Sequence, residues 1–261
     1  MKNTAKNEKL FWNCRAGNYP LPFDPATLGK TARILRLLRR LGADFSGRDI
    51  LDIGCGTGVY ALPLAGKAGK VMGIDSSPAM LRVFRAQARA RKIKNALCLQ
   101  AAWAKVPAAG IRDRFDISLA SMTNAIRGKA DLVKMEAAAR ELCVYIGWAG
   151  VRKNGLLEAA YAHHGLKYKA PEGAERVLRV LKAMGRKPRV EFITDSWAKS
   201  ATPTVTLGEI GVSVRVNGAR LDRRWTEAFL ERKSRGGLVR QVTRVRKALI
   251  TWVRPGRRPG S

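Results

Sequence analysis

The sequence predicts an α/β protein built on one doubly wound, mostly parallel sheet. Short apolar runs bounded by glycine alternate with amphipathic segments of helical spacing, and this alternation repeats from Asp49 to Trp148. Alternating strands and helices favour a parallel sheet covered on both faces. The chain has 261 residues, of which 46% are hydrophobic, enough for one substantial core. We therefore expect a single domain, residues 1–261, with a seven-stranded sheet.

The first elements follow from these patterns in chain order. Residues 13–25 are rich in Pro, Gly and Asn and predict a loop, and residues 26–41 predict a helix that ends at Gly42. Five strands are expected at residues 49–54, 70–75, 95–100, 114–121 and 142–148. Helices are expected between them at 59–65, 76–92 and 129–141. Ser76 or Ser77 can cap the helix over 76–92, and Pro78 suits its first turn.

Beyond Gly150 the pattern predicts further helices and two last strands. Helices are expected at 154–165, 173–185 and 221–233, and strands at 189–197 and within 238–253. Residues 204–216 are ambiguous, since Val and Thr favour a strand while Leu207, Ile210 and Val214 have helical spacing. Residues 254–261 are expected to be a disordered tail.

The charge is strongly positive, with 50 Lys+Arg against 20 Asp+Glu and a net charge of +30. Such a surface attracts acidic partners, so it is either a nucleic-acid interface or a general basic bias of the protein. The four cysteines lie far apart without a CxxC pair, which favours free thiols over disulfides or zinc ligands. We find neither a signal-peptide pattern nor a membrane span, and expect a cytoplasmic protein.

The stretch "LDIGCGTG", residues 51–58, predicts a ligand site at the carboxyl edge of the sheet. Gly54, Gly56 and Gly58 directly follow the first strand, where open α/β folds bind ligands. The spacing GxGxG lacks the small residue that a pyrophosphate-binding helix needs. Asp52 can receive an ammonium group, directly or through water, and Asp75 can accept hydrogen bonds from both ribose hydroxyls. These groups describe an amino acid joined to a nucleoside without phosphate, as in S-adenosylmethionine.

Residues 49–80 resemble the first two motifs of class I S-adenosylmethionine-dependent methyltransferases. "LDIGCGTG" is similar to their glycine loop, "GIDSSPAM" to the end of their ribose-binding strand, and "FDISLAS" to their fourth strand. The resemblance is closest to the small-molecule branch of the ubiquinone- and menaquinone-biosynthesis type. It implies a Rossmann-like sheet with an N-terminal lid and C-terminal helical insertions. Residues 1–45 would be the lid and first helix, 46–150 the cofactor-binding core, and 151–253 the substrate side.

The resemblance also implies roles for individual residues. Asp52 and the three glycines would line the methionine end of the cofactor, Asp75 would bind the ribose, and Ser76 and Met80 would lie against the adenine. Ala102 stands where the family usually has an acid that binds the adenine amino group. Trp103 after it either walls the adenine pocket or is an ordinary core tryptophan. Ala120 and Ser121 would supply backbone contacts.

Methyl transfer from a sulfonium needs mainly proximity and alignment, and a base only for a protonated acceptor. His163 and His164 are candidates for such a base, or simply form a helix end. Tyr19 or Trp12 either covers the sulfonium or anchors the leading segment. Arg152 either holds a carboxylate or phosphate or is a solvated surface arginine. No metal site is expected, since the acid cluster of magnesium-dependent O-methyltransferases is missing.

The leading hypothesis is an enzyme that transfers a methyl group from S-adenosylmethionine to a small-molecule acceptor and releases S-adenosylhomocysteine. One alternative is an RNA-directed methyltransferase, motivated by the net charge of +30. The other is a non-catalytic S-adenosylmethionine-binding protein, motivated by the missing adenine acid and the lack of an obvious catalytic residue.

Overall fold

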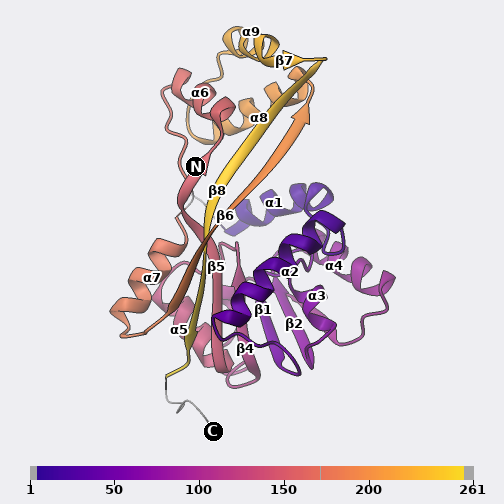
Figure 1. The fold of residues 1–261 in the computed structure, drawn as a ribbon, viewed down its shortest axis with the longest axis vertical. Helices are drawn as coiled ribbons and strands as arrows, with labels where there is room; N and C mark the ends of the chain where they lie inside the picture. Colours follow the sequence, from indigo (N-terminus) through magenta and orange to yellow (C-terminus); the bar gives the residue numbers. More distant parts are fainter. Residues whose placement is uncertain (1–4, 171, 256–261) are drawn as a thin grey trace. The chain divides into compact units, whose positions relative to one another are not determined.

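The computed structural model describes residues 5–170 and 172–255 (Figure 1). The helices, in chain order, are α1 Ala5–Arg15, the 3-10 helix η1 Ala16–Asn18, α2 Pro25–Arg40, α3 Ala61–Ala65, α4 Pro78–Ala90, the 3-10 helix η2 Trp103–Lys105, α5 Lys129–Ala138, α6 Gly155–His163, α7 Ala174–Ala183, α8 Pro203–Val216 and α9 Arg223–Lys233. The strands are β1 Asp49–Ile53, β2 Lys70–Asp75, β3 Ala96–Gln100, β4 Phe115–Ser121, β5 Ala139–Lys153, β6 Arg189–Ala201, β7 Ser234–Arg235 and β8 Leu238–Val253.

The strands form one sheet, which confirms the predicted α/β class. Their order is β3-β2-β1-β4-β5-β8-β6, and β7 pairs with β8. The pairs β1–β2, β2–β3, β1–β4 and β4–β5 are parallel, whereas β7 and β8 are antiparallel. The two-residue strand β7 is the one addition to the seven strands expected from the sequence. Because the strand order reverses between β1 and β4, their carboxyl ends form the switch point at which such sheets bind ligands.

The chain divides into two compact units, each assembled from separate segments. The core unit contains the described residues of Lys2–Gly147, Ala174–Glu191 and Ala248–Ser261, and the second unit contains Trp148–Gly173 and Phe192–Lys247. The expected boundary at residue 150 lies close to the start of the second unit. Residues 174–191 and 248–255 nevertheless belong to the core unit, and not with the C-terminal part in which the sequence placed them.

Capping side chains explain where several helices begin. The Asp24 side chain accepts a hydrogen bond from the Thr27 amide at the start of α2, and Ser77 does the same for the Met80 amide of α4. Ser77 is therefore the cap of the two serines considered. The ambiguous residues 204–216 are helical, because Thr202 caps α8 and Pro203 occupies its first turn.

Two boundaries differ from the sequence prediction. The expected helix over 129–141 ends at Ala138, and β5 begins at Ala139. Ala, Arg and Glu favour helix, but Arg140 and Glu141 form ion pairs with Asp116 and Arg48 that override this weak preference. The expected loop over 13–25 is also partly helical, since α1 and η1 extend to Asn18.

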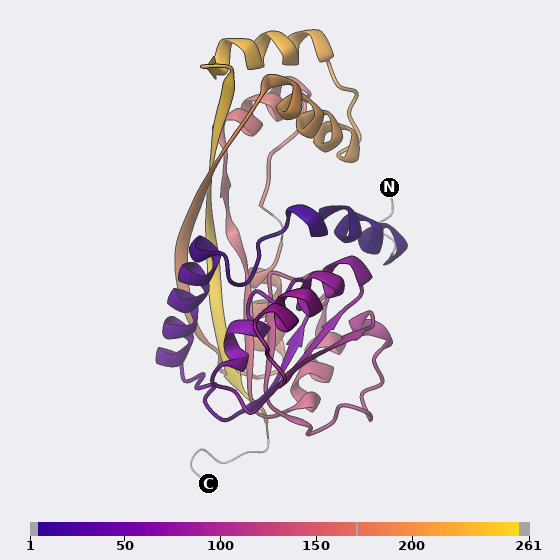
Figure 2. The same cartoon turned by 90° about the vertical axis from the view of Figure 1, so that its right-hand side faces the viewer.

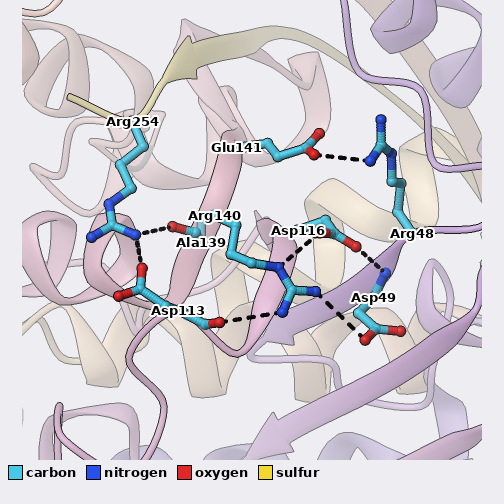
Figure 3. Close-up of polar contacts among 8 residues, drawn as sticks. All are labelled: Arg48, Asp49, Asp113, Asp116, Ala139, Arg140, Glu141 and Arg254. Atoms are coloured by element: carbon cyan, nitrogen blue, oxygen red, sulfur yellow. Dashed lines mark hydrogen bonds and ion pairs between the residues drawn. The ribbon is translucent and has the colours of Figure 1, made fainter. Parts of the chain in front are cut away.

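A polar network joins segments at the amino ends of β1, β4 and β5 (Figure 3). Arg140 Nε lies 2.9 Å from Asp116 Oδ1, its Nη2 lies 3.7 Å from Asp49 Oδ2, and Arg48 lies 2.8 Å from Glu141. Burial raises the pKa of Asp116, but hydrogen bonds from Arg140 and from the Asp49 amide, with the nearby arginine charges, lower it overall. The network therefore stabilises the ionised carboxylate.

Arg254 extends this network to the end of β8. Its guanidinium donates to the carbonyl of Ala139 at 2.9 Å and pairs with Asp113, and its amide donates to the carbonyl of Glu141. The sequence placed Arg254 in a disordered tail, which is incorrect, because these contacts hold its backbone and side chain. Residues 256–261 of the expected tail lie outside the described residues.

A buried carboxylate links three distant parts of the core unit. Glu136 on α5 is only 5% exposed. Arg186 binds it through two nitrogens at 2.8 and 2.9 Å, and Trp252 Nε1 in β8 donates to Glu136 Oε1 at 2.9 Å. A charge this deeply buried is tolerated when it is paired and fully hydrogen-bonded. The structure shows both partners in place.

The second unit has its own apolar cluster, formed by buried side chains of α6, α8, α9 and β8. Its members are Ala160, Ile210, Val214, Phe229, Leu230 and Val239. The helical spacing of Ile210 and Val214 places both on the inward face of α8. This cluster explains why residues 204–216 fold as a helix despite their β-branched composition.

None of the described helices is long and apolar enough to cross a membrane. Each of the four cysteines is a free thiol, as expected. Among the described residues no group of three or more His, Cys, Asp or Glu side chains is arranged to hold a metal ion. The cytoplasmic location stays a prediction.

Candidate functional site

The glycine loop follows β1 at the carboxyl edge of the parallel strands. The amides of Gly54 and Cys55 both donate to the carbonyl of Ile74 in β2, at 2.7 and 3.1 Å. Gly54 has φ +73°, in the left-handed region that favours glycine. A Cβ on Gly54 would also collide with the side chain of Thr123, in the segment after β4. Glycine at position 54 therefore lets the loop lie against that segment.

The other two glycines of the loop have different surroundings. A Cβ on Gly58 would lie 2.8 Å from carbon atoms of Leu62 and Phe84, so helix packing excludes a side chain there. A Cβ on Gly56 would meet only the Tyr19 ring, at an ordinary contact distance of 3.9 Å. Of the three, Gly56 has the space that the close approach of a ligand needs.

Asp75 at the end of β2 ties this loop to α4. Its Oδ2 accepts a hydrogen bond from the Gly56 amide at 2.9 Å, and its Oδ1 accepts one from the Ser77 amide at 2.8 Å. Burial raises the pKa of Asp75, against the lowering effect of these hydrogen bonds and one from Ser76. With three backbone donors on the carboxylate, acceptor capacity for one further hydrogen bond remains for a ligand.

Asp52 lies inside β1 and is only 2% exposed. Burial and the nearby charge of Asp75 raise the pKa of Asp52 to about 7, against a hydrogen bond from the Ala61 amide. Within the described residues neither Asp52 nor Asp75 forms an ion pair. The buried Asp52 and the half-buried Asp75 therefore lack a cationic partner, and a cation bound beside them would favour their ionised forms.

The N-terminal segment lies on the glycine loop and on the start of α4. Thr57 Oγ1 donates to the carbonyl of Pro20 at 2.8 Å, and Ser77 Oγ donates to Asn13 Oδ1 at 2.7 Å. Figure 2 shows α1, in indigo, lying along α4, with which it is in contact. Two side-chain hydrogen bonds thus attach this segment to the two elements that border Asp75.

Aromatic side chains of the same segment cover Met80. Met80 is 2% exposed and packs with Ala16, Ala79, Trp12 and Tyr19. The Trp12 and Tyr19 rings meet edge to face at 5.9 Å. Burial and the charge of Asp75 raise the pKa of the Tyr19 phenol, against the effect of Arg15. The phenol therefore keeps its proton beside the site.

The residues expected around the adenine lie after β2 and β3. Ser76 is half-buried in the turn before α4, and Ala102 is half-buried before η2. Trp103 is 4% exposed, with the Lys134 ammonium 4.6 Å from its ring centre. Its indole Nε1 is buried without a hydrogen-bond partner. The adenine contacts of Ser76, Met80, Ala102 and Trp103 stay predictions.

The end of β4 reaches the same edge of the sheet. Ala120 is fully buried and pairs in register with Ile53 of β1. Ser121 is half-buried, and its buried hydroxyl lacks a partner among the described residues. Met122 has φ +50°, a strained value for a residue with a side chain. Such strain at the mouth of a strand is typical of ligand sites, and the backbone contacts of Ala120 and Ser121 stay predictions.

The two histidines lie in the second unit, at the end of α6. His163 stacks on Trp225 at 3.7 Å, and its Nε2 lies 3.0 Å from Asp222. His164 has both ring nitrogens engaged, with Nδ1 donating to the carbonyl of Ala160 at 2.7 Å and Nε2 accepting from the Asp222 amide at 2.9 Å. These contacts join α6 to the start of α9, so both side chains have a structural role. Their catalytic role stays a prediction.

Three residues of this edge were not found from the sequence. Asn13 accepts a hydrogen bond from Ser77 at the start of α4, and the Thr123 side chain lies against Gly54 of the loop. Thr57 belongs to the loop itself and donates to the carbonyl of Pro20. The sequence shows a threonine inside the glycine motif, but it does not show that the carbonyl of Pro20 is its hydrogen-bond partner. No periodicity reports contacts between segments 37 or 64 residues apart.

Comparison with known proteins gives consistent results. Residues 50–143 match a family model described as a methyltransferase domain. The ubiquinone biosynthesis O-methyltransferase of Methylobacterium nodulans is 32% identical over 163 residues, which are 62% of this chain and 57% of that protein. The ribosomal protein L11 methyltransferase of Xylella fastidiosa is 40% identical over 81 residues, which are 30% of this chain and 26% of that protein. The chain thus spans little more than half of the first relative.

A solved structure extends the likeness of the fold beyond the matched residues. A protein of Bacillus halodurans C-125, provisionally assigned as a methyltransferase, superposes with a TM-score of 0.54 at 13% identity. The alignment covers 86% of this chain and 99% of that protein. At this identity the likeness supports the fold alone. Residues 50–143 thus match a methyltransferase-domain family, and the strand order and the glycine loop beside Asp52 and Asp75 agree with that match.

Proposed function

We propose that the chain binds S-adenosylmethionine at the glycine loop and transfers its methyl group to a small-molecule acceptor. The observation that carries this proposal is the pair of the buried Asp52 and the half-buried Asp75 at the loop, which have no cationic partner among the described residues. S-adenosylmethionine offers an ammonium and a sulfonium, two positive charges that such a pair attracts. A nucleotide phosphate would instead be repelled.

Each group has a role in this proposal. Asp52 receives the ammonium, directly or through water, and Asp75 accepts hydrogen bonds from the ribose hydroxyls. Gly54, Gly56 and Gly58 shape the backbone around the methionine end, with Gly56 as the point of closest approach. Tyr19, whose phenol stays protonated, covers the sulfonium with its ring. S-adenosylmethionine bound there would supply the methyl group, which the acceptor would take by in-line displacement with S-adenosylhomocysteine as the leaving group.

The small-molecule acceptor is supported by the relatives of the ubiquinone type, which match the longest part of the chain. The L11 methyltransferase match covers only 81 residues, 30% of this chain, and so gives little support to a protein acceptor. Acceptor pockets of this fold come from the segments outside those motifs. His163 and His164 serve as a base only if the acceptor keeps a proton and if one of them leaves its contact with Asp222.

Calorimetry with S-adenosylmethionine and S-adenosylhomocysteine tests the cofactor proposal. Wild type should bind both, and Asp75→Ala and the milder Asp75→Asn should weaken binding by at least about tenfold, the value of one or two lost charged hydrogen bonds. Asp44→Ala is the matched control, since Asp44 is an exposed acid of the core unit away from the loop. Absence of binding to wild type, or equal affinity for Asp75→Ala and wild type, would refute the proposal.

The net charge of +30 favours one second candidate, methyl transfer to RNA. Binding governed by phosphates should weaken steeply as salt rises, with a log–log slope close to the number of phosphates contacted. Filter binding of a structured RNA between low and physiological salt measures that slope. A flat response, or no affinity at physiological salt, would leave the small-molecule acceptor alone.

A further inference from the structure

Arg152 belongs to an aromatic cluster inside the second unit. Its guanidinium carbon lies 5.0 Å from the ring centre of Tyr168 and 5.8 Å from that of Trp148. The Tyr168 ring in turn meets the Tyr161 ring edge to face at 5.3 Å. Trp148 and Arg152 lie on β5, four residues apart, which corresponds to roughly 13 Å of regular strand. The long arginine side chain therefore runs back along β5 toward the tryptophan.

Two polar atoms of this cluster are buried without hydrogen-bond partners. They are Nε of Arg152 and the hydroxyl of Tyr168. The neighbouring Tyr161 differs, because its hydroxyl lies 2.6 Å from Ser213 Oγ and accepts a hydrogen bond from Asn217. A buried donor left unpaired costs on the order of 1–3 kcal/mol, and more when it is charged. Both atoms belong to side chains that contact each other, and both lack an acceptor among the described residues.

Two other partly buried arginines have found acceptors for Nε, whereas Nε of Arg176 is also buried without a partner within the described residues. Arg246, also in the second unit, donates from Nε to the carbonyl of Ala149 at 2.8 Å. Arg186 in the core unit binds both oxygens of Glu136. Arg152, by contrast, pairs with no carboxylate in the part of the chain that the structure describes. Nε of Arg152 thus has no hydrogen-bond partner in the part of the chain that the structure describes.

We propose that Trp148, Arg152 and Tyr168 form a binding site for an oxyanion carried by a planar ring. Arg152 supplies a fork of N–H donors that matches the two oxygens of a carboxylate. The Tyr168 hydroxyl donates a further hydrogen bond, and the Trp148 and Tyr168 rings contact the ring of the ligand. The chemical class of the ligand is an anionic aromatic compound, a small molecule of the kind that the proposed function, on which this identification rests, takes as its acceptor.

Binding of small probes tests the site without the cofactor. Benzoate and phenyl phosphate carry a ring and an oxyanion, benzyl alcohol carries the ring alone, and acetate carries the anion alone. Saturation-transfer NMR and calorimetry should show saturable binding of benzoate or phenyl phosphate, and at least about tenfold weaker binding of benzyl alcohol and acetate. The aromatic anion with the higher affinity indicates whether the site binds a carboxylate or a phosphate.

Variants assign the binding to the cluster. Arg152→Gln should weaken binding of the aromatic anion at least about tenfold, and Tyr168→Phe several-fold. Lys153→Gln, which removes the same charge from the next, exposed residue, should change the affinity less than twofold. Arg152→Met should lose binding while the melting temperature of the free protein stays level or rises, because the substitution removes an unpaired buried group. A structural arginine would instead lower that melting temperature.

Three results would overturn the inference. They are no binding of either aromatic anion to wild type, equal losses in Arg152→Gln and Lys153→Gln, and a fall in the melting temperature of Arg152→Met with benzoate binding retained. Calorimetry with S-adenosylmethionine runs on the same samples. If the protein binds S-adenosylmethionine normally but does not bind benzoate, only the anion site is rejected. If it binds benzoate but not S-adenosylmethionine, only the proposed function is rejected.

Discussion

Replacing Asp52 with Asn should stabilise the cofactor-free protein at neutral to alkaline pH while it abolishes cofactor binding. The pKa of Asp52 is raised by burial and by Asp75 from 3.8 to about 7. The folded state holds the Asp52 proton more tightly than the unfolded state. This proton therefore contributes favourably to the free energy of unfolding, and the contribution is complete below pH 3.8. It is lost as the pH rises through about 7.

The size of the effect follows from the shift. About three pKa units at 1.4 kcal/mol per unit correspond to about 4 kcal/mol, an upper value because water penetration relaxes buried charges. Asn keeps the shape but does not ionise. The stability difference between Asp52→Asn and wild type should therefore change by about 2–4 kcal/mol in favour of the variant between pH 4 and pH 8.

Urea denaturation followed by far-UV circular dichroism at both pH values measures this difference directly. Glu175→Gln, which alters an exposed acid of the core unit, is the control and should show a change below about 1 kcal/mol. Calorimetry on the same samples should show loss of S-adenosylmethionine binding in Asp52→Asn. A stability difference that is equal at pH 4 and pH 8 would refute the argument that ionised Asp52 is an unfavourable group awaiting a cation.

Three further predictions concern packing and ion pairs. Arg140→Gln should lower the free energy of unfolding by about 1 kcal/mol or less at pH 7, since Arg140 is 44% exposed. Urea titrations should show this loss disappear as the pH falls through the lowered pKa of Asp116, because the protonated carboxyl no longer pairs with Arg140. Gly58→Ala should lower the free energy of unfolding by about 2 kcal/mol or more, because its φ is +90° and its Cβ would collide with Leu62 and Phe84. In the same assay the control Gly208→Ala, on the exposed side of α8, should be neutral or stabilising by up to about 1 kcal/mol. Asn13→Ala should remove the acceptor of Ser77 Oγ and raise hydrogen exchange in α1 by about fivefold, the equivalent of about 1 kcal/mol, and unchanged exchange would mean that Asn13 does not hold this helix.

Local patterns predicted the core of the fold because they are set by neighbouring residues. The runs at 49–54 and 70–75 became β1 and β2, and the glycines and acids at their ends fixed the position of the candidate site. Ser77 and Pro78 likewise marked the start of α4 correctly. Strand ends and caps depend on a few adjacent residues, so a single sequence reports them.

Contacts between distant segments were not predictable in the same way. The start of β5 depends on ion pairs of Arg140 and Glu141 with residues 24 and 93 positions away. The attachment of Asn13 to Ser77 and the unpaired donors of Arg152 and Tyr168 likewise arise only when the chain is folded. Burial of Trp103 favours its interpretation as a core residue, but its free indole N–H leaves the predicted role at the adenine open to the binding experiments.

The discontinuous core unit has a consequence for folding during synthesis. After Gly147 has emerged from the ribosome, about 100 residues follow before Ala248 begins the segment of β8 that belongs to the core unit, and β8 neighbours β5 in the sheet. At about 5–20 residues per second this takes roughly 5–20 s. During that time the apolar residues 143–146 of β5 have an open strand edge. Glu136 has neither of its two partners until Arg186 is synthesised, and after that it still lacks Trp252. Nascent chains halted in this interval should therefore bind chaperones and aggregate more readily than the finished protein.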